Sequence, residues 1–338
     1  MREGSFMKKI LVTGLWTLLL TTVLTVPAFA QELVVGGQVV GVQISTDGVM
    51  VAGVSQIETG DGSALSPAES AGVKPGDLIV SVDGQRVSGA ADVISAVDAC
   101  QGGAVKLSVV RGGRELSFCV EPVRSADGQW LLGLWLRDGL SGLGTLTFCD
   151  PDSGVFGALG HSINDSDSGL TVPVKEGSIT DAQIVSVNPG SSGSPGELNG
   201  CADLSRVLGS IELNTDHGIF GQAFVDMDGR RLETGSMCVG PASIVSTISG
   251  RSSREYSVEI NRIYREADGT HAMLSVTDPE LIQRTGGIVQ GMSGSPIIQN
   301  GKLVGAVTHV FVSDPTRGYA VSIQDMLHAA GIDQSKAA

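Results

Sequence analysis

Short apolar runs separated by turn residues follow one another along the chain, and this pattern predicts β-strands rather than long helices. In the first half, strand-length runs lie at 39–44, 49–54, 78–82, 104–110 and 115–120, with a turn at 46–48. Two segments carry helical signals: 66–72 ends with a glycine, and 90–99 places Val93 and Val97 on one face. These features predict a small β-rich module with two short helices.

The second half of the chain repeats the pattern of short apolar runs. They lie at 131–136, 144–148, 182–187, 219–224, 257–263, 271–276, 296–298 and 303–312. A helix is predicted only near the end, at 323–330, where Gly331 stops it. So many short strands in a single stretch predict a β-barrel or a pair of barrels. The fold class expected is therefore mainly β.

The N-terminus has the pattern of an export signal. Basic residues precede an apolar stretch at 10–26, and Ala28-Phe29-Ala30 follows it. This order is typical of a secretory signal peptide, here residues 1–30. The apolar stretch is slightly short for a membrane span, which takes about 20 residues, so an uncleaved signal anchor is the alternative. We expect the protein to work outside the cytoplasm.

Composition and charge narrow the class of protein. With 41% hydrophobic and 17% charged residues the chain is too apolar to be disordered, and its 47 glycines have no triplet period, which excludes collagen. A net charge of −14 without a basic cluster argues against nucleic-acid binding. The five cysteines show no C-x-x-C spacing, so we expect neither a structural metal site nor a full disulfide framework, and no cofactor.

The segment 71–84, with the sequence AGVKPGDLIVSVDG, resembles the signature stretch of bacterial PDZ domains. The resemblance implies a PDZ domain over 33–124, a polar linker at 125–129, a second domain over 130–333 and a tail at 334–338.

PDZ domains hold an extended peptide between a strand edge and a helix, and backbone N–H groups of the preceding loop bind its carboxylate. By this resemblance Val40, Gly41 and Val42 would form that loop. Val93 and Val97, on the predicted helix, would line the opposite wall. The partner expected in this groove is a peptide segment of the chain itself or of another protein.

The strongest catalytic signal is Gly291-Met292-Ser293-Gly294-Ser295-Pro296. A serine nucleophile needs a base to take its proton and N–H donors for the oxyanion that its attack creates. The pattern resembles the nucleophile loop of chymotrypsin-like peptidases. On that analogy Ser293 attacks the substrate, and the N–H groups of Gly291 and Ser293 form the oxyanion hole.

A second segment, Gly190-Ser191-Ser192-Gly193-Ser194-Pro195, has nearly the same pattern, with Ser192 in the equivalent place. The residues that follow it favour a turn instead of the strand expected behind a nucleophile. Ser192 also comes only 31 residues after His161, which leaves too little chain for the intervening strands. Ser293 is therefore the better candidate.

His161 is the best candidate for the base, because it follows an apolar run well before Ser293, as in the chymotrypsin order. His309, on the strand after the nucleophile, is a candidate for the substrate pocket. Spacing alone does not select the acid that orients the base. Its candidates are Asp278, Asp165, Asp150 and Asp152.

Several stretches of the second half together resemble the SpoIVB family of sporulation serine peptidases. They are 133–138, 144–148, 156–161, 285–302 and 305–312. The resemblance implies a PDZ domain followed by a chymotrypsin-like double β-barrel. It also implies a triad of His161, Asp278 and Ser293, although an acid so close to the serine departs from chymotrypsin's spacing.

The function that this resemblance implies is a self-processing serine endopeptidase of sporulation signalling. It would be exported from the forespore across the inner forespore membrane into the intermembrane space. There it would cleave the exported part of a membrane-bound inhibitor complex, activating an intramembrane protease and hence processing of a mother-cell sigma factor. The alternatives are a non-catalytic PDZ scaffold and an HtrA-like quality-control protease, in which the order of the domains is reversed.

Overall fold

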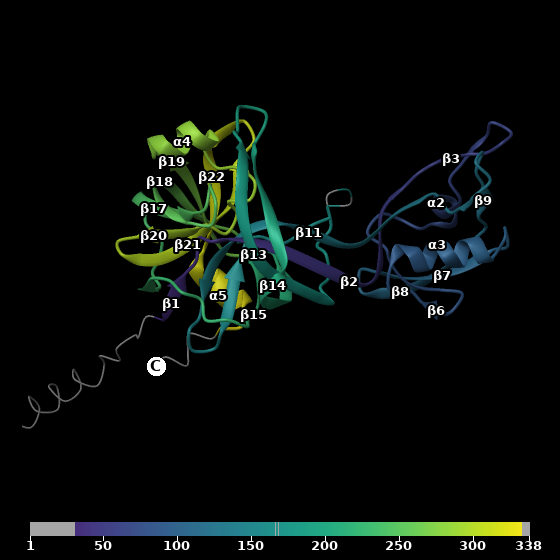
Figure 1. Ribbon diagram of the computed structural model, residues 1–338, viewed down its shortest axis with the longest axis horizontal. Helices are drawn as coiled ribbons and strands as arrows, with labels where there is room; N and C mark the ends of the chain where they lie inside the picture. Colours follow the sequence, from purple (N-terminus) through teal and green to yellow (C-terminus); the bar gives the residue numbers. More distant parts are fainter. Residues whose placement is uncertain (1–30, 166, 168, 333–338) are drawn as a thin grey trace, which may run out of the picture.

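β-Strands make up most of the chain in the computed structural model, which describes residues 31–165, 167 and 169–332. The expected signal segment, 1–30, and the expected tail lie outside the described residues. Within the described part, no helix has both the length and the apolar character needed to cross a membrane. Figure 1 shows two strand-rich bodies joined by the long strands β2 and β11.

Six antiparallel strands close into a first barrel, in the order β2, β11, β12, β15, β14, β13 and back to β2. Its strands are β2 (Val39–Val54), β11 (Leu134–Cys149), β12 (Val155–Ala158), β13 (Glu176–Asn188), β14 (Glu197–Thr215) and β15 (Gly218–Ala223). Val40, Leu146, Phe156 and Ile179 fill its interior and are almost fully buried. Burial of such apolar side chains is the main force that closes the barrel.

A second barrel closes in the order β17, β18, β19, β22, β21, β20. Its strands are β17 (Gly240–Ser246), β18 (Arg254–Arg265), β19 (Thr270–Val276), β20 (Pro296–Gln299), β21 (Lys302–Phe311) and β22 (Asp314–Ser322). Ile244, Ile260, Leu274 and Met292 lie in its core. The expectation of a mainly β chain with a double β-barrel is confirmed.

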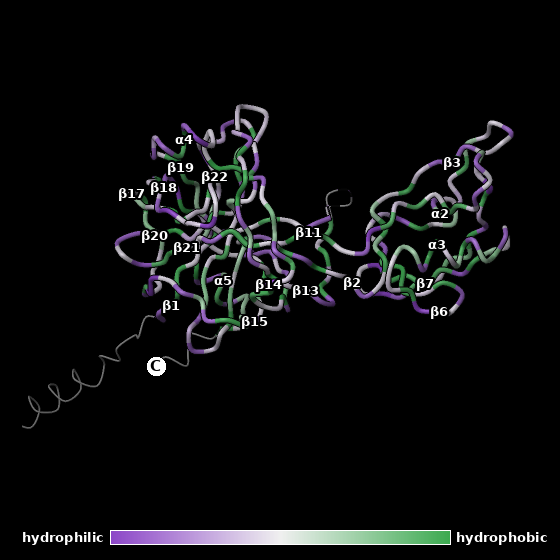
Figure 2. Tube along the Cα trace, viewed as in Figure 1, coloured by the Kyte–Doolittle hydropathy of each residue, from purple (hydrophilic) through white to green (hydrophobic). Residues whose placement is uncertain are grey.

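Short elements complete the two-barrel body. β1 (Glu32–Val35) pairs with β11 and with β16 (Arg231–Glu233). Helix α4 (Pro279–Thr285) precedes the nucleophile segment, and α5 (Ile323–Ala329) is the predicted C-terminal helix. Figure 2 shows hydrophobic stretches along the strands of both bodies and hydrophilic ones at many of the turns.

The second body is the PDZ module, at the right of Figure 1. Its own elements are β3 (Ile57–Glu58), β4 (Ala64–Leu65), α2 (Pro67–Ala71), β5 (Leu78–Val82), β6 (Gln85–Arg86), α3 (Ala90–Ala99), β7 (Val105–Arg111), β8 (Arg114–Val120), β9 (Val123–Arg124) and β10 (Trp130–Leu131). Val49, Ile79, Val93 and Leu107 share its core. Both predicted helices form where the sequence pattern indicated.

The predicted domain boundaries at 33 and at 125–129 are wrong, because the PDZ module is inserted into the first barrel. β2 pairs with β11 from Val39 to Val54, with β13 over its first half and with β5 at Val49 and Met50, without the predicted turn at 46–48. The expected linker is the turn of the β9–β10 hairpin. A long strand shared by two bodies leaves no boundary in the apolar pattern, which explains the error.

Candidate active site

Ser293 lies in a tight turn directly before β20, at the junction of the two barrels. The Met292 N–H donates to the Val289 carbonyl at 3.1 Å, and the Ser295 hydroxyl donates to the Met292 carbonyl at 2.7 Å. Met292 is fully buried and anchors the turn in the second core. The neighbouring Ser293 is only partly buried, so its hydroxyl faces the cleft.

The first barrel holds this turn through strand β11. The Thr145 hydroxyl donates to the Gly291 carbonyl at 2.9 Å, the Thr145 N–H to the Ser293 carbonyl at 3.0 Å, and the Thr147 hydroxyl to the Gly294 carbonyl at 2.7 Å. Thr145 and Thr147 are both buried, so these bonds satisfy polar groups in the interior. Their role was not predicted, although threonines at alternate positions of an apolar run, Thr145 and Thr147, were a visible signal.

Gly294 is the residue that allows the two barrels to approach so closely. A Cβ atom at this position would lie 2.1 Å from the Thr145 carbonyl oxygen and 2.5 Å from the Leu159 nitrogen. Its φ of +93° also favours glycine. Leu159, two residues before His161, has a φ of 69°, which is rare for a leucine. Close contact therefore sets the backbone path of the segments that carry the two candidates, Ser293 and His161.

His161 follows β12, and its imidazole ring contacts the backbone of the next residue. Nδ1 lies 2.7 Å from the Ser162 carbonyl oxygen. Since a carbonyl can only accept, Nδ1 carries the proton and the neutral ring keeps a lone pair on Nε2. Burial and the adjacent His309 lower the pKa of His161 to about 4, while the bond to Ser162 acts in the opposite direction. The ring is therefore a neutral base at pH 7.

His309 packs against this base from strand β21. The two imidazole rings have centroids 4.5 Å apart and are tilted by 33°. Burial lowers the pKa of His309 as well. The candidate pocket histidine is thus in direct ring contact with the candidate base, which its position in the sequence did not predict.

A cavity of about 520 Å³ brings the candidates together. Ser293, His161, His309 and Gly291 all line it. The rest of the lining is mostly aliphatic and includes Leu140, Leu143, Leu159, Ile163, Ile288, Val289 and Val310. No carboxylate, lysine or arginine belongs to the lining among the described residues. A mainly apolar cavity with a few convergent polar groups is typical of a ligand-binding or active site.

The Ser293 hydroxyl donates to the Thr308 carbonyl at 2.7 Å and not to His161. A rotation of the side chain is therefore needed before the base can take its proton, as is common without substrate. The N–H groups of Gly291 and Ser293 donate no hydrogen bond to any described residue. Both remain available to an oxyanion, which is consistent with the predicted oxyanion hole.

Comparison with known proteins identifies the peptidase segment. The model of the SpoIVB peptidase S55 family matches residues 128–327, more than half of the chain, and a PDZ domain model matches 61–111. The chain belongs to the SpoIVB peptidase S55 family. It is therefore a serine peptidase with a PDZ domain, and the expected family and enzyme class are confirmed.

Solved structures add a distant likeness. The Rv3671c protease of M. tuberculosis in its active form is 14% identical, with a TM-score of 0.34 over 57% of this chain and 75% of that chain. An inactive form of the same protease is 13% identical, with a TM-score of 0.32 over 56% and 84%. TM-scores of this size do not establish a shared fold, so the strand pairings define the fold of this S55 peptidase.

Asp278, which the family resemblance implied as the acid, caps helix α4. Its carboxylate accepts the Leu281 N–H at 3.0 Å and the Ser257 N–H at 3.3 Å. His161 instead uses Nδ1 on the Ser162 carbonyl. Among the described residues no hydrogen bond joins Asp278 to His161: one carboxylate oxygen caps helix α4, and the other accepts from Ser257 on strand β18.

The other candidate acids also have different partners. Asp165 is fully buried and lies 3.5 Å from Arg137. The Asp150 carboxylate accepts hydrogen bonds from the turn that contains Asp152 and Ser153. None of these carboxylates forms a hydrogen bond with His161 among the described residues.

Ser192 serves the structure of the β13–β14 loop. Its hydroxyl donates to the Ser313 carbonyl at 2.9 Å. The adjacent Gly190 N–H donates to the Thr285 carbonyl at 2.8 Å. This loop is packed against the segments that flank the cavity, and its serine has no histidine beside it among the described residues.

The PDZ groove differs from the expectation at one wall. Val40, Gly41 and Val42 lie within the first barrel, paired with β11 and β13, and therefore cannot be its carboxylate-binding loop. The groove, a cavity of about 790 Å³, lies instead between α3 and residues 130–136. Val93 and Val97 line it from α3, as expected, and also reach the module core.

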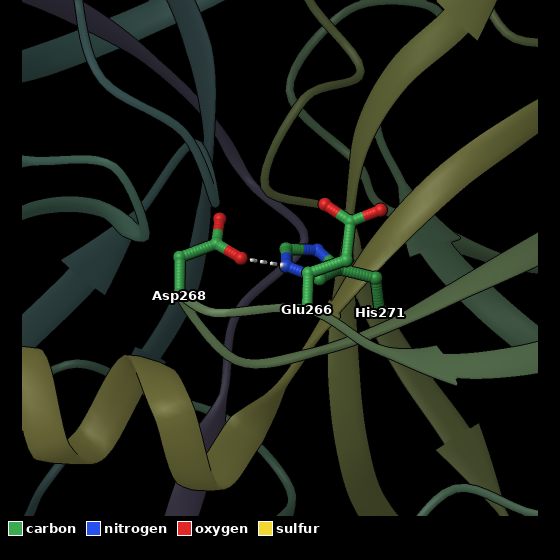
Figure 3. Close-up of side chains that lie close together, drawn as sticks. All are labelled: Glu266, Asp268 and His271. Atoms are coloured by element: carbon green, nitrogen blue, oxygen red, sulfur yellow. Dashed lines mark hydrogen bonds and ion pairs between the residues drawn. The ribbon is translucent and has the colours of Figure 1, made fainter.

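One cluster of possible metal ligands lies at the β18–β19 hairpin (Figure 3). The ligand atoms of Glu266, Asp268 and His271 lie within 4.8 Å of one another. Asp268 accepts a hydrogen bond from His271 Nε2 at 3.1 Å, which lowers the pKa of its carboxyl. The two acids are exposed, and the three residues do not line the cavity that contains Ser293. The hydrogen bond between Asp268 and His271 within the turn explains why these side chains lie together.

Proposed function

We propose that this S55 peptidase cleaves peptide bonds with Ser293 as nucleophile and His161 as general base. The observation that carries the proposal is the shared cavity, which a nucleophile from the second barrel and a base from the first both line. The free Gly291 and Ser293 N–H groups lie in the same turn and fit an oxyanion hole.

The chemistry follows from this arrangement. Ser293 Oγ attacks the substrate carbonyl carbon while His161 Nε2 takes the hydroxyl proton. His161 then gives that proton to the leaving amine as the C–N bond breaks, which leaves an acyl-serine. Water, deprotonated by His161, attacks the acyl carbon and releases the acid product and the free serine.

We further propose that the substrates are this chain itself and the exported part of a membrane-bound regulator of an intramembrane protease. This proposal rests on the family and on the export pattern of residues 1–30. The chain would then act in the intermembrane space of the forespore, and the groove beside α3 would hold a peptide segment of a substrate or of the chain.

The test is self-cleavage of the purified chain, followed by mass spectrometry of the fragments. We expect Ser293→Ala to abolish the fragments, because it removes the nucleophile. Ser192→Ala is the matched control, since it alters the same sequence pattern at an exposed turn. Fragments from Ser293→Ala equal to those of the wild type would contradict the proposed role.

A further inference from the structure

The groove of the PDZ module has a free strand edge. At Leu134, Trp135 and Leu136 strand β11 pairs with β2 on one side. Its other described partners, β1 and β12, pair with it only beyond residue 145, so no described strand covers the opposite edge of 134–136. The same three residues line the groove together with α3. An extended peptide can therefore add to this edge as a further strand.

Exposed apolar side chains flank this edge. Trp135 on β11 is 60% exposed, Ile94 on α3 is 56% exposed, and both line the groove. Leu131, just before β11, is exposed as well. Exposed apolar side chains that gather in one groove mark an interaction site. The walls therefore fit apolar side chains of an added strand, which alternate between its two faces.

Helix α3 gives the groove two different ends. At the N-terminal end of α3, the Ala90 N–H donates to Oδ1 of Asp138. Just after its C-terminal end, a Cβ atom at Gly102 would lie 2.5 Å from the indole of Trp130. Residues 130–138 therefore run along α3 in the opposite direction, and the turn before β11 lies near the C-terminal end of the helix.

Three carboxylates gather at this C-terminal end. Asp98 lies in the last turn of α3. The Ala126 N–H donates to the Glu58 carbonyl at 2.9 Å, which places Glu58 beside the β9–β10 turn that contains Asp127. All three acids line the groove and are exposed, and none of them has an ion-pair partner among the described residues. The described lining contains no lysine, arginine or histidine. The C-terminus of α3 adds the negative end of its dipole.

This charge is the wrong one for a free carboxyl terminus. The turn before β11 does offer donors, since the N–H groups of Leu132 and Gly133 donate no hydrogen bond to any described residue. A carboxylate bound there would, however, lie close to the three acids without a cation to offset them. A lysine or arginine side chain in the same place is attracted by all three.

We propose that the groove beside α3 binds an internal polypeptide segment that carries lysine or arginine next to apolar residues, in preference to a free carboxyl terminus. The segment adds to β11 as a strand, places apolar side chains against Ile94, Val97 and Trp135, and directs a cationic side chain to the acidic end. This inference rests on the proposed role of the groove as a peptide-binding site and specifies which peptides it takes.

The experiment measures binding of fluorescent peptides, by anisotropy at low ionic strength, to the full chain carrying Ser293→Ala. The probes are short peptides in which valine alternates with lysine or with glutamate, each made with a free carboxylate and with a C-terminal amide. We expect the lysine amide to bind about 10-fold more tightly than the glutamate amide, the combined effect of several exposed ion pairs. A free carboxylate should weaken binding of the lysine probe about 3-fold. High salt should remove the preference, because it screens exposed charges.

Charge-reversal variants locate the effect. Glu58→Lys combined with Asp98→Lys should reverse the preference, so that the glutamate probe binds more tightly. Glu115→Lys combined with Glu121→Lys is the matched control, since both are exposed acids of the PDZ module outside the groove lining and the net charge changes equally. It should leave the preference for lysine unchanged. Trp135→Ala should weaken every probe and keep the melting temperature, because this side chain is exposed.

Three results would overturn the inference. They are tighter binding of a carboxylate probe than of its amide, a lysine preference that survives Glu58→Lys with Asp98→Lys, and binding that Trp135→Ala does not weaken. Failure of all the probes to bind would also remove the proposed peptide-binding role of the groove. Self-cleavage by the Ser293→Ala chain would instead contradict the proposed nucleophile, so the failures are distinguishable.

Discussion

At the scale of single residues, the site is built on neutral groups. His161 is held by a peptide carbonyl and by the ring of His309, and the described cavity lining has no carboxylate. A base with its pKa lowered to about 4 is unprotonated in mild acid as well as at pH 7. We therefore expect cleavage to persist at pH values where a histidine with an ordinary pKa near 6.5 would already be protonated.

The contact with His309 gives this pH dependence a direct test. His309→Phe keeps an aromatic ring over His161 but removes the second charge, which contributes to the low pKa of His161. The pKa of His161 should rise, so the acid limb of kcat/KM should move to higher pH. The control is His328→Phe, which alters an exposed histidine on α5. An acid limb that does not move would show that the ring contact leaves the base unaffected.

Sequence patterns pointed to the candidate nucleophile and base but not to the residues that hold them in place. Ser293 and His161 lie in recognisable glycine-rich segments, and the structure brings both to one cavity. Asn214 and Thr145 act on backbone groups that are 51 and 146 residues away. No local pattern marks a side chain whose partner is a distant peptide bond, so these roles required the fold.

At the scale of secondary structure, the sequence around Asp278 carries a helix-start signal. The family resemblance, which implied a triad role for Asp278, was given more weight than this signal. Asp278-Pro279-Glu280 has a capping residue, a proline at the first helical position and an acid in the first turn. This pattern predicts the start of a helix, and α4 begins there. The family resemblance implied a triad role for the same carboxylate, and in the structure its hydrogen-bond partners are Leu281 and Ser257.

Strand β11 has three roles that its local sequence pattern did not reveal. Its start lines the PDZ groove, its residues from Leu134 to Thr145 pair with β2, and its end holds the turn of Ser293 through Thr145 and Thr147. The apolar pattern showed two separate runs within it. The connection between them appeared only with the register of the pairing to β2.

At the scale of the whole molecule, the insertion of the PDZ module means that it cannot be removed from one end. Val51 and Leu136 face each other on β2 and β11. We expect a chain in which residues 52–135 are replaced by an Asn-Gly turn to keep the double barrel, because both flanking strands retain their partners within the first barrel. The shortened chain should remain soluble, and it should cleave an unstructured protein substrate by using its Ser293 as the nucleophile.

The matched comparison is a chain that begins at residue 125, near the boundary that the sequence predicted. It lacks β1 and β2, and β2 lies between β11 and β13 in the first barrel. This fragment should be insoluble or inactive, as judged by circular dichroism and cleavage of the same substrate. A folded and active fragment would show that the shared strand is dispensable.

The most direct measurement is labelling of the full chain with a fluorophosphonate, which reacts only with an activated serine, followed by mapping of the modified residue by mass spectrometry. The predicted result is modification of Ser293 in the wild type and its loss in His161→Ala, with Ser192 unmodified in both. Labelling of Ser293 that is equally strong without His161, or no labelling of Ser293 at all, would contradict the catalytic pair.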